Sequence, residues 1–218
     1  MRAAIFDLDG TLADTLPGIT EATRRLLEAE GLAPLPADVL RGFVGLGERV
    51  FLGHVIAASG LPSDPDSVVR LRDAFMVHYV ACGGYGALYP AALAALDALA
   101  DSGWALGLCT NKPEAAARPV LAATGLEGRF GAEVFGDTLP ERKPNPAPLV
   151  LARDRLGARQ AVYVGDSEVD AATARAAGLP FALFLGGYRK DPEQGIAPDL
   201  AFEDWNALPA ALDALLAS

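Results

Sequence analysis

The sequence predicts an α/β fold, a doubly wound parallel sheet that carries an inserted α-helical subdomain. Short apolar runs alternate with helical patterns through most of the chain. One long helical stretch interrupts this alternation directly after the first run. At 218 residues, of which 51% are apolar and 21% charged, the chain has enough material for one such domain with an insert.

The predicted strands are short apolar runs that end at a polar or small residue. They cover residues 3–6, 105–109, 132–135, 161–164 and 181–185, with a weaker candidate at 200–202. Helical patterns between and after them cover residues 91–101, 113–123, 146–156, 169–177 and 206–217. Strands that alternate with helices form right-handed βαβ units, so we expect a parallel sheet covered on both faces. Ligands of such sheets bind beyond the carboxyl ends of the strands.

The stretch from residue 14 to 88 contains helical patterns only. They cover residues 17–30, 37–43, 48–59 and 66–80, and their connectors are rich in Gly and Pro. We therefore expect residues 1–13 and 89–218 to form the core domain and residues 14–88 to form a helical cap. An insert at this point lies over the carboxyl edge of the sheet, where it can act as a lid.

Charge and composition exclude several classes of partner. The net charge is −10 and the basic residues are scattered, whereas a protein that binds nucleic acid needs a basic surface. No stretch approaches the roughly 20 apolar residues of a membrane span. The first residues enter a strand without a signal-peptide pattern, and two cysteines cannot build a disulfide framework. We expect a cytoplasmic protein, monomer or homodimer, whose partner is a small molecule.

Two aspartates at the end of the first strand are the strongest chemical signal. Asp7 and Asp9 are two residues apart, so their carboxylates share one side of the strand end. A core strand has no structural use for two neighbouring carboxylates, because burying unpaired like charges is costly. Gly10 and Thr11 then turn the chain and can offer backbone N–H groups to an anion. The alternative is an ordinary Asp-Gly turn.

Three later motifs follow other predicted strands, and each has an ordinary structural explanation. Thr110 and Asn111 can bind a phosphate oxygen or cap a helix. Lys143, in a proline-stiffened loop, can bind an anion or simply face solvent. Asp166 and Asp170 can hold a metal or compensate a helix dipole. In a parallel sheet, however, all of these residues converge with Asp7 and Asp9 on one edge.

The converged set predicts a metal-assisted phosphoryl-transfer site. Four carboxylates beside one lysine need a cation, and an all-oxygen ligand set selects a hard cation such as Mg²⁺. Asp7 is then the nucleophile that forms an aspartyl-phosphate. Asp9 protonates the leaving oxygen and later takes a proton from the attacking water. Lys143 neutralises charge on the transferring group.

With these residues in place, the chain resembles the haloacid dehalogenase superfamily of aspartate-nucleophile phosphatases. The four superfamily motifs occur in order: Asp7-Leu8-Asp9-Gly10-Thr11, Thr110-Asn111, Lys143-Pro144, and Gly165-Asp166-Ser167 through Asp170. Within the superfamily the chain is most similar to bacterial phosphoglycolate phosphatases. The resemblance implies a Rossmann-like haloacid dehalogenase fold and Mg²⁺-dependent hydrolysis of 2-phosphoglycolate.

The resemblance also implies how the metal is held and where the substrate binds. Asp7, Asp9 and Asp166 would hold the metal, Asp9 through its backbone carbonyl, and Asp170 would complete the set. In the cap, the segment Gly45-Leu46-Gly47 departs from the Gly-Asn-Gly of many relatives, which leaves the substrate open. Arg49, directly after it, is a candidate to pair with a substrate carboxylate, although a solvated helix arginine is an equally good explanation.

Alternatives remain open at this point. The chain can be a phosphatase of another small metabolite or sugar phosphate, or a phosphomutase similar to β-phosphoglucomutase. Dehalogenase chemistry is disfavoured because it needs no second aspartate, yet Asp9 is present. A non-enzymatic binding protein on this fold is disfavoured because the nucleophile, the metal ligands and Lys143 are all intact. The sequence does not choose among divalent metals.

Overall fold

A six-stranded parallel sheet forms the centre of the computed structural model, which describes residues 1–189 and 196–217. Its strands run in the order β5-β4-β1-β6-β7-β8, and every neighbouring pair is parallel. The strands are β1 (Arg2–Phe6), β4 (Ala105–Cys109), β5 (Ala132–Val134), β6 (Gln160–Gly165), β7 (Phe181–Phe184) and β8 (Leu200–Phe202). The predicted doubly wound parallel sheet is therefore confirmed.

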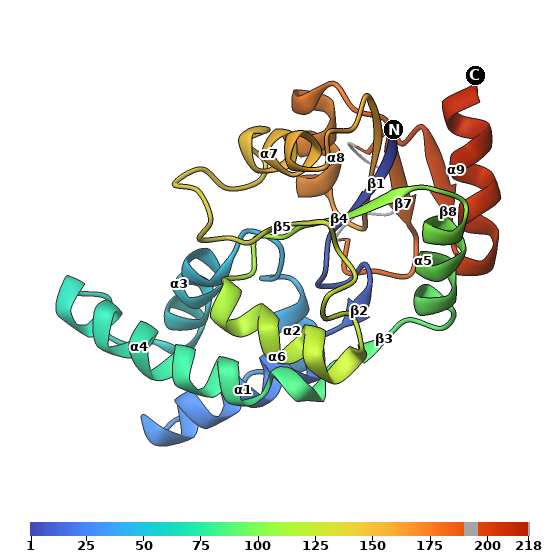
Figure 1. Cartoon of the computed structure of the whole chain (residues 1–218). Coiled ribbons are helices and arrows are strands. Elements are labelled where there is room, and N and C mark those ends of the chain that lie inside the picture. The colour runs from blue at the N-terminus through green and yellow to red at the C-terminus, as the bar shows by residue number, and fades with distance from the viewer. Residues whose placement is uncertain (190–195, 218) are drawn as a thin grey trace.

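Helices cover both faces of this sheet (Figure 1). One face packs on α5 (Ala92–Asp101), α6 (Glu114–Thr124) and α9 (Leu208–Ala217), and the other on α7 (Ala147–Arg155) and α8 (Glu168–Ala177). Side chains alternate along β1, so that Phe6 belongs to the first core and Ile5 to the second. Because β1 lies between β4 and β6, the order of the strands reverses there, and the crevice beyond its carboxyl end is where such sheets bind ligands.

The chain is mostly helical from residue 16 to residue 85. It contains α1 (Leu16–Ala29), α2 (Ala37–Arg41), α3 (Glu48–Ser59), α4 (Pro65–Ala81) and the short 3₁₀ turn η1 (Gly83–Tyr85). These helices have an apolar core of their own, in which the rings of Phe51, Phe75 and Tyr79 stack in series. In Figure 1 the blue-to-teal helices gather on one side of the molecule, away from α7, α8 and α9.

A small antiparallel ladder joins the helical segment to the rest of the chain. Strand β2 (Ala13–Asp14) pairs with β3 (Ala87–Leu88) where the chain leaves the core and returns to it. The sequence does not predict this ladder, because two residues on each strand give no periodic pattern. We propose this ladder as the boundary between the core domain and the cap.

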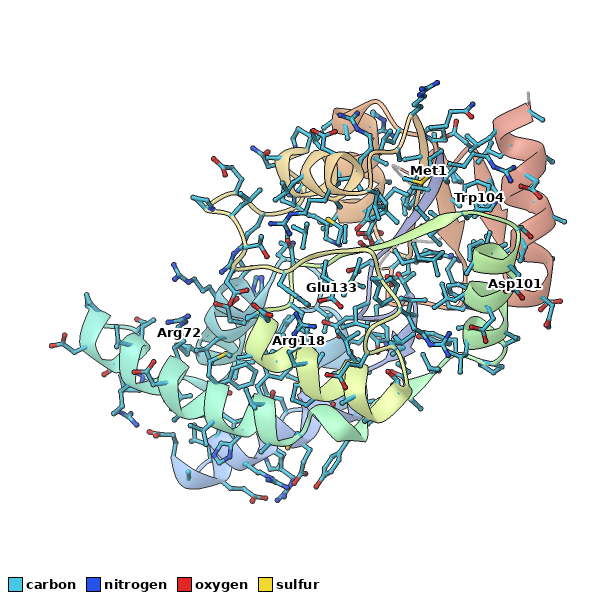
Figure 2. All side chains as sticks on the ribbon, in the orientation of Figure 1. Met1, Arg72, Asp101, Trp104, Arg118 and Glu133 are labelled. Atoms are coloured by element: carbon cyan, nitrogen blue, oxygen red, sulfur yellow. The ribbon has the colours of Figure 1, made fainter. Side chains whose placement is uncertain are left out.

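Other elements lie close to their predicted positions. The last helix is preceded by a 3₁₀ turn, η2 (Trp205–Ala207), whose Trp205 is buried in the core. Arg118 on α6 and Glu133 on β5 form an ion pair of 2.7 Å between a helix and the edge strand (Figure 2). Within residues 1–189 and 196–217, no helix is both long and apolar enough to cross a membrane.

Candidate active site

Asp7 follows β1 at the reversal point of the sheet. Its backbone N–H donates to the carbonyl oxygen of Val164 at 2.9 Å, so the residue continues the pairing between β1 and β6. Only 7% of Asp7 is exposed. The sheet thus holds the predicted nucleophile rigidly at the crevice beyond its carboxyl edge.

The loop after Asp7 is built around Gly10. This glycine has φ +83, and a Cβ there would lie 2.6 Å from Asp166 Oδ2. The Gly10 N–H donates to the Ala13 carbonyl at 2.9 Å and the Thr11 N–H to the Leu8 carbonyl at 3.3 Å. The Thr11 hydroxyl donates to Asp166 Oδ1 at 2.8 Å. These two residues, predicted to bind an anion, therefore shape the loop and orient Asp166.

Lys143 reaches the carboxylates from the loop before α7. Its Nζ lies 2.9 Å from Asp7 Oδ1 and 2.7 Å from Asp170 Oδ1, and it donates to the Tyr163 hydroxyl at 2.8 Å. Asn111 fixes this lysine by accepting from its N–H and donating to its carbonyl, each at 3.0 Å. The Asn111 amide also donates to the Gly45 carbonyl of the cap segment at 3.0 Å. Asn111 therefore connects the lysine loop to the cap.

Asp7, Asp166 and Asp170 form a buried carboxylate cluster in which one oxygen of each lies within 4.8 Å of the others. Asp170 is well supplied with donors: Lys143 and Tyr163 on Oδ1, and the Ser167 hydroxyl at 2.6 Å on Oδ2. Asp7 Oδ1 is different, because its contact with Lys143 is an ion pair without the geometry of a hydrogen bond. This buried oxygen has no hydrogen-bond donor among the described residues.

The electrostatics of the cluster favour a bound cation. Burial, helped by the charges of Asp170 and Asp9 and opposed by Lys143, raises the pKa of Asp7 to about 7. Burial and the neighbouring Asp170 and Asp7 raise the pKa of Asp166 well above its usual value. Burial acts the same way on Asp170, but the charge of Lys143 and the hydrogen bonds from Lys143, Ser167 and Tyr163 together outweigh it and lower the pKa of that carboxyl. One lysine thus does not balance three buried acids. The donor set is all oxygen, and Asp7 Oδ1 has no hydrogen-bond partner among the described residues beyond its ion pair with Lys143, so the cluster fits a hard divalent cation.

Asp9 has different surroundings from Asp7. Its carboxylate accepts from the Thr15 hydroxyl at 2.6 Å and from Lys112 Nζ at 3.0 and 3.3 Å. It does not belong to the three-carboxylate cluster. Two carboxylates in one crevice with separate partners can take separate roles, one facing the cation site and the other free for proton transfer.

A cavity between the core and the cap opens onto both aspartates. Thr110, Asn111 and Lys112 line it from the core, and Glu48 and Tyr79 line it from the cap. Lys112 Nζ donates to the Tyr79 hydroxyl at 2.6 Å. We call this space the cap-side cavity.

The sequence does not identify Lys112, Glu48 and Tyr79 as site residues, although all three line the cap-side cavity. Lys112 directly follows Thr110 and Asn111, but a single lysine carries no signal of its own. Glu48 and Tyr79 belong to α3 and α4, and only the placement of the cap over the core brings them to the site. The Glu48 side chain is 1% exposed and pairs with Arg142 Nη1 at 2.9 Å.

Arg49 does not join the other predicted site residues. Its side chain is 67% exposed, and the nearest carboxylate oxygen is Glu48 Oε1 at 3.6 Å. Arg49 does not line the cap-side cavity. It lines a groove on the cap together with residues of α3 and α4. The exposure of a helix arginine depends on how its helix packs, which the local sequence does not show.

Tyr188 connects the carboxylate cluster to the start of the cap. Its N–H donates to Asp166 Oδ2 at 2.5 Å, and its hydroxyl accepts from the N–H groups of Thr15 at 2.7 Å and Leu16 at 2.9 Å. A Cβ at the preceding Gly187 would lie 2.2 Å from Asp166 Cβ, so only glycine allows this approach. Asp166 is therefore held from the Thr11 side and from the Tyr188 side at once.

Comparison with known proteins agrees with this geometry. Residues 1–178 match the family model of the haloacid dehalogenase-like hydrolases. The chain is 45% identical over 218 residues to a phosphoglycolate phosphatase of Cereibacter sphaeroides, covering 100% of both chains. It is 44% identical over 214 residues to a phosphoglycolate phosphatase of Rhodospirillum rubrum, covering 95% of this chain and 89% of the relative.

Among solved structures, a predicted phosphoglycolate phosphatase of Haemophilus somnus superposes with a TM-score of 0.90 at 28% identity, covering 96% of this chain and 97% of the other. The full-length similarity to named phosphatases confirms the expected enzyme class, a phosphoric monoester hydrolase. By its family model and by its full-length relatives, the chain belongs to the haloacid dehalogenase-like hydrolases.

Proposed function

We propose that this protein is a Mg²⁺-dependent phosphomonoester hydrolase that cleaves 2-phosphoglycolate to glycolate and phosphate in the cytoplasm. The observation that carries the proposal is the different environment of the two aspartates. Asp7 lies 2.9 Å from Lys143 within a buried acidic cluster, whereas Asp9 lies in the cap-side cavity beside Lys112 and Thr15. The substrate is taken from the full-length relatives named phosphoglycolate phosphatase.

In the first half-reaction an oxygen of the Asp7 carboxylate attacks phosphorus. The bond from phosphorus to the glycolate oxygen breaks, and that oxygen takes a proton from Asp9. Lys143, held by Asp170 and Tyr163, places its positive charge against the reacting Asp7 oxygen. Asp7 then carries the phosphoryl group as an acyl phosphate.

In the second half-reaction Asp9 takes a proton from a water molecule. The water oxygen attacks phosphorus, the bond to Asp7 breaks, and inorganic phosphate leaves. Thr110 lines the cavity beside both aspartates and is available to orient a phosphate oxygen. Asp9 thus gives up a proton in the first half-reaction and regains one in the second.

The proposed metal is Mg²⁺. Asp7, Asp166 and Asp170 would hold it, together with the backbone carbonyl of Asp9. When bound, it supplies charge neutralisation and Lewis-acid polarisation of the phosphoryl oxygens. The raised pKa values of Asp7 and Asp166, and an Asp7 Oδ1 whose one described partner is the ion pair with Lys143, support a cation at this place.

The test is phosphate release by purified protein with Mg²⁺ from 2-phosphoglycolate, hexose 1-phosphates, nucleotides and pyrophosphate. We expect 2-phosphoglycolate to give the highest kcat/KM. Strong turnover of another ester with none on 2-phosphoglycolate would contradict the substrate. Isomerisation of a hexose phosphate without release of phosphate would instead indicate a mutase.

A further inference from the structure

A hydrolase of 2-phosphoglycolate must hold a carboxylate close to the oxygen that leaves. In this substrate the carboxylate carbon is bonded to the carbon that bears the leaving oxygen. The carboxylate therefore lies within a few ångströms of the residue that protonates this oxygen, which is Asp9 in the proposed mechanism. Binding of the substrate carboxylate therefore requires a positively charged group close to Asp9.

Lys112 is the cationic side chain among the described residues that line the cap-side cavity. Its Nζ lies 3.0 Å from Asp9 Oδ1, and its side chain is 1% exposed. Glu48, the acid that the cap contributes to this lining, already has Arg142 at 2.9 Å and Arg72 at 3.5 Å. Lys112 is thus the one group in this lining that can offer positive charge to a substrate anion.

Lys112 and Tyr79 can both donate to a substrate anion. An ammonium group carries three N–H donors, and Lys112 directs them to both oxygens of Asp9 and to the Tyr79 hydroxyl. The contact with Asp9 Oδ2, at 3.3 Å, is the longest of the three, so this donor can turn to a substrate carboxylate at the smallest cost. The Tyr79 hydroxyl accepts from Lys112 at 2.6 Å, and its own proton has no acceptor among the described residues. The Tyr79 O–H and the Lys112 N–H that now contacts Asp9 Oδ2 therefore belong to a cavity that is also lined by the proposed acid and nucleophile.

We propose that Lys112 and Tyr79 together bind the carboxylate of the leaving group and so select phosphate esters whose leaving group is an anion. This inference rests on the proposed hydrolysis of 2-phosphoglycolate. Lys112 follows β4 in the core, and Tyr79 belongs to α4 of the cap, so the receptor is complete only with the cap over the core. Lys112 and Tyr79 thus take the role of carboxylate receptor that the sequence suggested for Arg49, because the exposed side chain of Arg49 does not line this cavity.

The experiment compares two esters of similar size, 2-phosphoglycolate and ethyl phosphate, which lacks the carboxylate. Wild type, Lys112→Met, Tyr79→Phe and Arg49→Met are assayed with Mg²⁺ for kcat and KM on both. A charged hydrogen bond that the site is built to make contributes about 1.5–3 kcal/mol, which corresponds to a loss of roughly 10- to 150-fold. We expect Lys112→Met to lower the preference for 2-phosphoglycolate by about 100-fold, mainly through KM, and Tyr79→Phe by about 10-fold. Arg49→Met should leave this preference unchanged.

An equal loss on both esters in Lys112→Met would show that Lys112 acts only by placing Asp9, and would overturn the inference. A preference lowered by Arg49→Met, but by neither of the other variants, would overturn it as well. Wild type that cleaves ethyl phosphate but not 2-phosphoglycolate would overturn the proposed function and this inference with it. Thermal melting checks that each variant folds. If Lys112→Met does not fold, the comparison of wild type with Tyr79→Phe, which removes only one hydroxyl, still tests the inference.

Discussion

Individual residues of the acidic cluster differ in what they contribute to stability without a metal. Burial raises the pKa of Asp7 to about 7 and that of Asp166 well above its usual value, so folding favours the protonated form of both carboxyls. The folded state therefore binds more protons than the unfolded state above about pH 4, and stability falls as the pH rises towards 7. Asp170 has the opposite effect on the pH dependence of stability, because its pKa is lowered, mainly by Lys143.

Asp166→Asn should therefore stabilise the metal-free protein at pH 8 relative to pH 5.5, because it removes a carboxyl that loses its proton more readily in the unfolded chain. Asp170→Asn, the matched control in the same cluster, should destabilise it by about 3 kcal/mol, because Lys143 loses its partner. Thermal unfolding in EDTA at pH 5.5 and pH 8 measures both. Added Mg²⁺ should raise the melting temperature of wild type more than that of Asp166→Asn. Equal destabilisation by the two substitutions would contradict the electrostatic account.

The backbone conformation of Ala91 also lowers the stability of the protein. It has φ +64, in the left-handed region that costs a residue with a Cβ about 1–2 kcal/mol. Ala91→Gly should stabilise the protein by about 0.5–1 kcal/mol, since the greater freedom of glycine in the unfolded chain offsets part of the relief. Ala94→Gly, three residues on within α5 and exposed, should destabilise by about 1 kcal/mol. Urea unfolding measures the free energy of unfolding of both variants. If Ala91→Gly and Ala94→Gly both lower it, Ala91 is not strained.

At the scale of elements, the helix α3 of the cap is tied to the loop before α7 of the core by one ion pair. Glu48 is almost fully buried and Arg142 partly so, with 2.9 Å between Oε2 and Nη1. Pairs of this kind are worth more than surface pairs, because little water screens them and an unpartnered buried charge is costly.

A double-mutant cycle with Glu48→Gln and Arg142→Gln should give a coupling energy above about 1 kcal/mol in unfolding, with a parallel loss in kcat/KM. The control cycle uses Glu30 and Arg70, an ion pair within the cap whose arginine is 54% exposed, and should give at most about 0.5 kcal/mol. Additive effects at Glu48 and Arg142 would mean that this pair does not hold the cap on the core.

Across the whole molecule, the four central strands β1, β4, β6 and β7 could be predicted because each is a short apolar run buried on both faces. The edge strand β8 gave a weaker signal, and Ala201 in it is exposed. Asp7, Asp9, Lys143, Asp166 and Asp170 could be placed together because parallel strands end at one edge. The ladder β2–β3 was too short to give a pattern. Lys112, Tyr79 and Glu48 meet only when the cap folds back over the core, an arrangement that local periodicity does not encode. The same packing leaves Arg49 in solvent.

Net charge also acts at this scale. The chain carries −10 overall, so an anionic substrate is repelled on average and must be drawn in locally. The buried Lys112 and Lys143 supply that local charge on either side of the aspartate pair.

The central claim is that Asp7 and Asp9 divide the chemistry between nucleophile and acid/base. Its most direct test is rapid-quench turnover of p-nitrophenyl phosphate by Asp9→Asn, followed by peptide mapping. The nitrophenolate leaves without a proton, so the first half-reaction proceeds, whereas hydrolysis lacks its base. We predict a burst of nitrophenolate near one equivalent of enzyme, with the phosphate on Asp7, and no burst in Asp7→Asn. Phosphate found on another residue, or full turnover by Asp7→Asn, would contradict the account.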